Sequence, residues 1–104
     1  MFRNDAQICC ALKILLRNIK GGRLWTDTGP SDAAVHASLN PVPWSHGEII
    51  MLQVAFDFWN GDGKAKFASV LNKLDYDNTK LVTGLWIACN DGAEAVDRWI
   101  EDNR

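Results

Sequence analysis

Three cysteines and two histidines are the residues best suited to chemistry in this chain of 104 residues. The thiols belong to Cys9, Cys10 and Cys89, and the imidazoles to His36 and His46. A thiol beside an imidazole is typical of a nucleophilic enzyme, and two imidazoles with a thiolate suit zinc. However, the cysteines lie among apolar residues, where burial raises the pKa of a thiol, and the spacing of a metal site is missing. We therefore expect no catalytic residue, no metal and no cofactor, and we favour a protein that is not an enzyme.

Asp57 is the only acid within a long apolar segment, and it is the one candidate for acid–base chemistry. It follows Gln53 by four residues, so the two side chains share a face of a helix. Because a buried carboxylate is costly without a partner, we expect this face to be the exposed strip of that helix. A small enzyme or ligand binder with a cleft near Asp57 and His46 is the second alternative function, and it requires a pocket where these groups converge.

A basic stripe suggests a different chemistry, the binding of phosphates or of an acidic partner. It consists of Lys13, Arg17 and Lys20, which lie at i, i+4 and i+7 and so share one helix face. Such a stripe can neutralise phosphate charge. Proteins that read bases also carry aromatic and amide side chains among the cations, and these are missing here. A nucleic-acid-associated protein that uses this face is therefore the first alternative function.

Five tryptophans are present, and two of them lie outside the expected helices. Trp25 and Trp44 fall in a long connection, Trp44 being close to His46. Tryptophan is enriched at interfaces, and connections often carry function. Trp25, Trp44 and His46, together with the basic stripe, are thus our candidate partner-binding residues. The other three tryptophans fall on helix faces that should belong to the core: Trp59, Trp86 and Trp99.

The helix that should organise these residues runs over about residues 48–59. Ser45 followed by Glu48 is a capping-box pattern, and Asn60 with Gly61 is a turn signal that ends the segment. The segment is apolar almost all the way round, which is typical of a helix buried among others. The sequence therefore predicts that this helix is the centre of the domain.

Further helices are expected on both sides of the central one, because apolar residues recur there at helical spacing. Asp77 or Asn78 should cap one of them. Residues 21–45 form a long irregular connection in which residues 31–38 can make a two-turn helix, and no segment alternates as a strand does. The prediction is an all-α fold, a single compact domain over residues 1–104 with four to five helices. The other helices should span about residues 5–19, 64–74 and 79–89, with a last helix that carries Val96, Trp99 and Ile100.

Composition limits the class of protein. The net charge is −2, from 11 basic and 13 acidic side chains, so neither a polycation nor a polyanion role follows. An odd number of cysteines, two of them adjacent, argues against a disulfide framework and fits a reducing cytoplasm. No apolar run reaches the roughly 18 residues that a membrane span needs. We expect a small cytoplasmic helical protein that acts as a non-enzymatic protein-interaction or regulatory module. Its partner should be a protein and not a membrane, and a homodimer is left open because core and interface residues look alike in composition.

Overall fold

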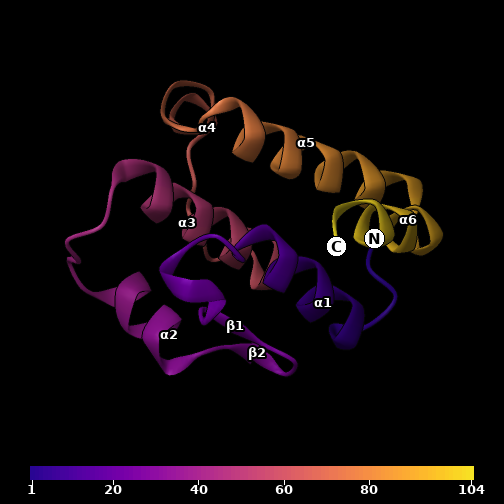
Figure 1. Ribbon diagram of the computed structural model, residues 1–104, viewed down its shortest axis with the longest axis horizontal. Helices are drawn as coiled ribbons and strands as arrows, with labels where there is room; N and C mark the ends of the chain where they lie inside the picture. Colours follow the sequence, from indigo (N-terminus) through magenta and orange to yellow (C-terminus); the bar gives the residue numbers. More distant parts are fainter.

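Six α-helices and one short β-hairpin make up the chain in a computed structural model that describes all of residues 1–104 (Figure 1). A 3₁₀ turn (Lys20–Gly22) and the strands β1 (Trp25–Thr26) and β2 (Gly29–Pro30) lie between the first two helices. The fold is mostly α, with 68% of the chain in helices, where the sequence predicted an all-α fold. Its radius of gyration is 12.6 Å, close to the value of about 13 Å for a compact chain of this length. The helices are α1 (Asp5–Leu15), α2 (Asp32–Leu39), α3 (His46–Asn60), α4 (Phe67–Lys73), α5 (Tyr76–Asp91) and α6 (Ala93–Asn103).

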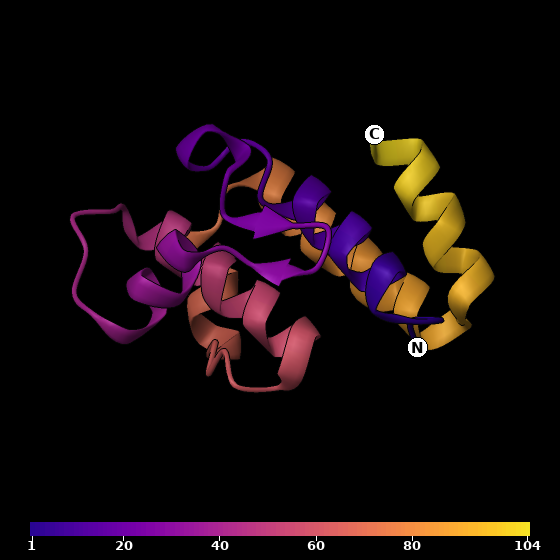
Figure 2. The same ribbon diagram turned by 90° about the horizontal axis from the view of Figure 1, so that it is seen from below.

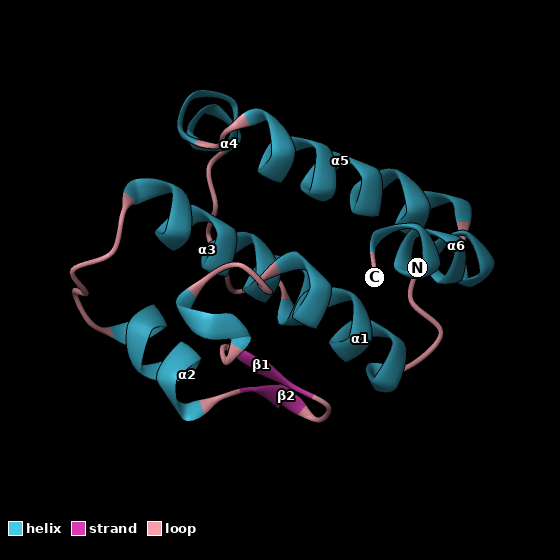
Figure 3. Ribbon diagram, in the orientation of Figure 1, coloured by secondary structure: helices cyan, strands magenta, loops and turns pink.

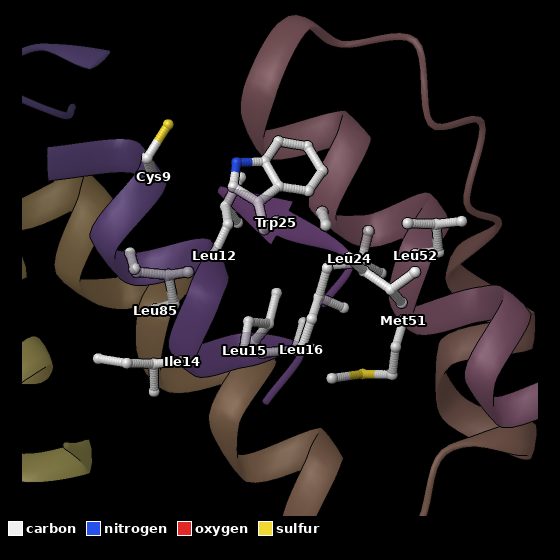
Figure 4. Close-up of a cluster of buried hydrophobic side chains, with 14 of the residues drawn as sticks. Cys9, Leu12, Ile14, Leu15, Leu16, Leu24, Trp25, Met51, Leu52 and Leu85 are labelled. Atoms are coloured by element: carbon white, nitrogen blue, oxygen red, sulfur yellow. The ribbon is translucent and has the colours of Figure 1, made fainter. Parts of the chain in front are cut away.

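α1, and not the helix predicted over residues 48–59, is the helix against which most of the other elements pack. It contacts β1, α3, α5 and α6, and α6 lies beside it at one end of the molecule (Figure 2). Asn4 caps α1 by accepting a hydrogen bond from the N–H of Gln7, at 2.9 Å. The apolar face of α1 packs into a cluster with side chains of α3, α5 and β1 (Figure 4). The largest fully buried side chains of the protein are Leu12, Leu16, Leu24, Met51, Leu85, Val96 and Cys9.

α3 is the helix predicted over residues 48–59. The Ser45 hydroxyl accepts from the N–H of Glu48 at 3.2 Å, and the Glu48 carboxylate accepts from the N–H of Ser45 at 3.1 Å. The predicted capping box is therefore present. Gly61 ends the helix in the left-handed conformation, with φ of 81°, which glycine adopts most readily. The buried residues of α3 are Ile50, Met51, Leu52, Val54 and Ala55.

A β-hairpin that the sequence did not predict lies between α1 and α2 (Figure 3). Trp25 pairs with Pro30, and Thr26 pairs with Gly29. The expectation of no strand was wrong because strands of two residues are too short to show alternation. The connection over residues 21–45, which was expected to be irregular, thus consists largely of regular structure. It contains the 3₁₀ turn, the hairpin and α2, which Ser31 caps.

α5 is longer than the predicted helix over residues 79–89. It begins at Tyr76 because Asp75, and not Asp77 or Asn78, is its N-cap. The Asp75 carboxylate accepts a hydrogen bond from the N–H of Asn78 at 2.8 Å. The molecule has six helices where four to five were expected: α4 lies within the helix predicted over residues 64–74, and the additional helix is α2, which the sequence allowed over residues 31–38.

Two glycines allow α5 and α6 to pack closely on each other. Gly92, with φ of 119°, joins the two helices in a conformation that side chains rarely adopt. Gly84 faces α6, and a Cβ atom there would lie only 3.1 Å from Nε1 of Trp99. Trp99 is buried against this flat part of α5, so its predicted place in the core is confirmed.

Candidate functional site

Trp25 lies in the core. It is only 2% exposed, and the rings of Phe56 and Trp59 meet it edge-on with centroids 5.3 Å and 5.7 Å away. Its Nε1 atom has no hydrogen-bond acceptor and lies on the side of the cluster where the Cys9 thiol stands (Figure 4). In this fold Trp25 is not accessible to a partner, and it fastens the hairpin to α3.

The thiols and imidazoles are not brought together in the fold. Burial raises the pKa of both the Cys9 and the Cys89 thiol, while Cys10 is partly exposed. His36 and His46 are exposed, and no hydrogen bond links either imidazole to a thiol. No group of three or more His, Cys, Asp or Glu side chains is placed to hold a metal ion.

The predicted helix over residues 5–19 ends at Leu15, so Arg17 and Lys20 lie beyond it and the basic stripe does not form one helix face as predicted. Two of its cations contact other parts of the molecule. Lys13 Nζ lies 2.6 Å from Oδ1 of Asp27 in the β1–β2 turn. This contact raises the pKa of Lys13 and lowers the pKa of Asp27. Arg17 donates a hydrogen bond to the backbone carbonyl of Asn103 at the end of α6. These side chains therefore fasten the hairpin and α6 to α1, and part of their positive charge is already engaged within the chain.

Trp44 and His46 flank the N-terminus of α3. Trp44 is half buried, and the Lys20 ammonium lies 5.3 Å from the centroid of its ring. The same ammonium lies 3.8 Å from Oε2 of Glu48. Of the predicted partner-binding residues, the structure thus brings Lys20 and Trp44 together and leaves His46 exposed beside them, whereas Trp25 is in the core.

Asp57 holds the loop between α3 and α4. Its carboxylate accepts hydrogen bonds from the N–H groups of Lys64, at 2.9 Å, and Ala65, at 3.1 Å. The side chain is exposed, as predicted for the face that it shares with Gln53. His46 lies eleven residues earlier on the same helix, which is roughly 16 Å along the axis. The predicted cleft that joins Asp57 and His46 is therefore not formed.

An apolar groove of about 330 Å³ lies between α3, α4 and α5. Three large side chains line it although they are mostly in contact with water: Phe67 is 66%, Leu71 61% and Trp86 54% exposed. Large apolar side chains gathered on one surface often mark an interaction site. The other apolar residues that line the groove are less exposed: Val54, Phe58, Ala65, Val70 and Val82.

The sequence pattern placed several residues of this groove on apolar helix faces, and it assigned Trp86 to the core. Phe67, Val70, Leu71 and Leu74 have helical spacing, and Trp86 follows the apolar face of α5. Yet α4 contains no buried residue, and Trp86 is exposed because no other element packs over this side of α5. The prediction that Trp86 belongs to the core was therefore wrong, and the groove as a site was missed.

A larger cavity, of about 560 Å³, lies between α2, the connection that follows it, and α3. Apolar side chains such as Trp44 and Phe56 line most of it. Residues with polar side chains line it near the end of α3 and in the next loop, among them Asn60, Asp62 and Lys64. Trp44 is the one predicted partner-binding residue that lines either space, and Asp57, the candidate for acid–base chemistry, lines the groove.

The chain matches no protein-family model, and no curated protein and no solved structure is significantly similar to it. No helix of the protein is both long enough and apolar enough to cross a membrane. The functional argument therefore depends on the groove and the cavity on the two sides of α3.

Proposed function

We infer that the protein is a non-enzymatic protein-interaction module whose α3–α4–α5 groove receives an amphipathic helix of a partner protein. The observation that carries this inference is the exposure of Phe67, Leu71 and Trp86 around one groove. Leaving such side chains in water forgoes about 25 cal/mol for each Å² of apolar surface. Burying them against a partner would recover that free energy.

The form of the groove supports a helical occupant. α4 and α5 supply two of its walls and α3 supplies the third, which is the arrangement of a helix-in-groove complex. Tryptophan is enriched among the residues that contribute most of the binding free energy at protein interfaces. Trp86 is accordingly expected to contribute most to the affinity.

The segment that supplies α4 and α5 contains more lysines than acids, and this favours an acidic partner helix. Between residues 64 and 90 only Asp75 and Asp77 are acidic, whereas four residues are lysines, although the chain as a whole has a net charge of −2. None of these lysines forms an ion pair within the molecule. Asp57 also lines the groove, but two backbone N–H groups already bind its carboxylate. The lysines are Lys64, Lys66, Lys73 and Lys80.

Photo-crosslinking in cells of the source organism tests this function. A crosslinking amino acid is placed at position 71, in the groove, or at position 39, which is 77% exposed in the wild type and lies outside the groove. We expect position 71 alone to capture one partner protein, through a segment with apolar residues at helical spacing and net negative charge. The capture should be lost in a Trp86→Ala variant, which removes an exposed ring and should keep the fold.

Three results would contradict this function. They are equal capture from positions 71 and 39, no capture from position 71, and capture of a basic segment. A crosslink to a second copy of the chain would contradict a separate partner protein and show that the groove mediates self-association.

A further inference from the structure

We propose that the cavity between α2 and α3 is a binding site for a small zwitterion with an apolar side chain, the chemical class of the apolar amino acids. This site is separate from the groove. Leu52 and Phe56 line the cavity, Val54 and Phe58 line the groove, and the two pairs lie on nearly opposite sides of α3. The proposed interaction with a partner helix does not involve the cavity.

The cavity has the size and the lining of a small-molecule site. Its volume of about 560 Å³ lies within the range of roughly 300–1,000 Å³ that is typical of such sites. The rings of Trp44 and Phe56 are part of its lining. Leu39 also lines it and is 77% exposed. A bound apolar group would therefore cover surface that the protein alone leaves in water.

The N-terminus of α3 holds Trp44 in place. Trp44 precedes the cap residue Ser45, and Ile49 is the fourth residue of the helix. Apolar residues at these two positions typically pack together, and both line the cavity. On the other side the Lys20 ammonium lies 5.3 Å from the centroid of the Trp44 ring and 3.8 Å from Oε2 of Glu48. A ring that is already positioned loses little freedom when a ligand binds.

The opposite end of the cavity is polar, and its loop is fixed by hydrogen bonds. The N–H of Asp62 donates to Oδ1 of Asn60, and the N–H of Lys64 donates to Oδ1 of Asp57, both at 2.9 Å. Between them Gly63 lies directly on α3, because a Cβ atom there would overlap the backbone of the helix. The polar residues therefore keep their places relative to the apolar walls.

Two opposite charges are available at this polar end. Asp62 and Lys64 both line the cavity, and neither forms an ion pair within the molecule. A ligand with a single charge would be attracted by one and repelled by the other, whereas a head group with an ammonium and a carboxylate matches both. The half-buried amide of Gln53, which makes no hydrogen bond, adds donors and an acceptor.

Nuclear magnetic resonance of the ¹⁵N-labelled full chain tests the proposal, with unlabelled L-tryptophan as the probe. The indole N–H signal of Trp44, assigned with a Trp44→Phe variant, and the side-chain amide signal of Gln53 should shift until they saturate. N-acetyl-L-tryptophan lacks the ammonium and L-tryptophanamide lacks the carboxylate, so each should bind at least tenfold more weakly. In the Asp62→Asn variant, N-acetyl-L-tryptophan should bind as strongly as L-tryptophan does. In the Lys64→Gln variant, L-tryptophanamide should bind as strongly as L-tryptophan does.

The control variant is Leu71→Asp, which alters the groove and should leave the affinity for L-tryptophan unchanged. If neither the Trp44 nor the Gln53 signal moves, the cavity is not a site for this class. Equal affinity for the three probes would contradict a site for zwitterions. The same conclusion would follow if the Asp62 and Lys64 variants both preferred L-tryptophan over its two derivatives as strongly as the wild type does. Backbone amide spectra show whether each variant keeps its fold. None of these results depends on a partner protein, so the proposed interaction is judged separately.

Discussion

At the scale of single residues, burial separates two tryptophans that occupy the same connection. Trp25 is enclosed by the rings of Phe56 and Trp59, and its Nε1 atom lies on the side of the Cys9 thiol. The ring is only 2% exposed, so its apolar contacts hold it in the core. Trp44 is only half buried, although the Lys20 ammonium lies near one side of its ring. The rest of the ring is therefore accessible to a ligand.

Alanine at each position should measure this difference. Trp25→Ala should lower the free energy of unfolding by about 3–5 kcal/mol, as expected for a large aromatic residue in a core. Trp44→Ala should lower it by about 1–2 kcal/mol, because only part of the ring is buried. Urea denaturation followed by circular dichroism gives both values. Similar losses in the two variants would contradict the placement of Trp25 in the core and Trp44 at the cavity.

Gly63 should tolerate alanine poorly although its backbone conformation is not left-handed. A Cβ atom there would overlap the carbonyl oxygen of Gln53 and lie 2.6 Å from the backbone nitrogen of Asp57. Because neither atom can move without disturbing α3, we expect Gly63→Ala to cost about 3 kcal/mol. Gly61→Ala is the matched control: φ is 81° but the space around it is open, so the cost should be about 1 kcal/mol. Equal denaturation midpoints of the two variants would disprove the close contact.

Asp57 shows what sequence reasoning can and cannot give for one residue. Its exposure was predicted correctly, because an unpaired carboxylate is unfavourable in a core. Its two hydrogen bonds to the N–H groups of Lys64 and Ala65 were not predicted. They depend on the path of a loop seven and eight residues later, and no spacing rule describes that path.

At the scale of elements, the start of α3 was predicted better than that of α5, whose cap is Asp75 and not Asp77 or Asn78. The capping box of Ser45 and Glu48 placed α3 within two residues of its observed start. The faces of helices were predicted less well, because periodicity shows which side of a helix is apolar but not whether another element covers it. This is why Trp86 of α5 was assigned to the core, and why the groove that it lines with α4 was not foreseen.

The N-terminal segment is joined to α6 by a polar cluster that should respond to acid. Arg3 donates two hydrogen bonds to the Asp97 carboxylate, at 2.8 Å and 3.2 Å, and Gln7 donates one at 2.8 Å. These contacts lower the pKa of Asp97 below its ordinary value of 3.8, and the hydrogen bonds from Arg3 have the largest effect. The unfolded chain therefore takes up its proton at higher pH than the folded one. The stability that Asp97 adds is complete above its ordinary pKa and is lost as the pH falls through the lower folded value.

Asp97→Asn should therefore flatten the loss of stability in acid. In the wild type the denaturation midpoint should fall as the pH goes below about 4, and in the variant this slope should be shallower. Asp102→Asn is the control, because it removes an exposed carboxylate of α6 that forms no ion pair. An Asp97→Asn variant with the acid slope of the wild type would show that the cluster is not formed in solution.

At the scale of the whole molecule, buried residues are distributed unevenly among the helices. α1 has six buried residues and α3 has five, whereas α2 has only Ala34 and α4 has none. Both candidate sites use this difference in the same way. α3 forms one side of each space, and a helix with little burial, α2 for the cavity or α4 for the groove, forms another. Each site thus combines a firmly packed side with a wall that is held by few core contacts.

Hydrogen exchange of the native protein should reveal this pattern. Helices with few buried side chains open locally at lower free energy, so amides within α2 and α4 should exchange at least tenfold faster than those in the middle of α1 and α3. A tenfold difference corresponds to about 1.4 kcal/mol in opening free energy. If the cavity and the groove bind as proposed, L-tryptophan should slow exchange in α2 more than in α4, and the captured partner segment should do the reverse. Equal protection of all four helices in the free protein would mean that the walls are as firmly packed as α3, and both spaces would then be fixed features of the core surface.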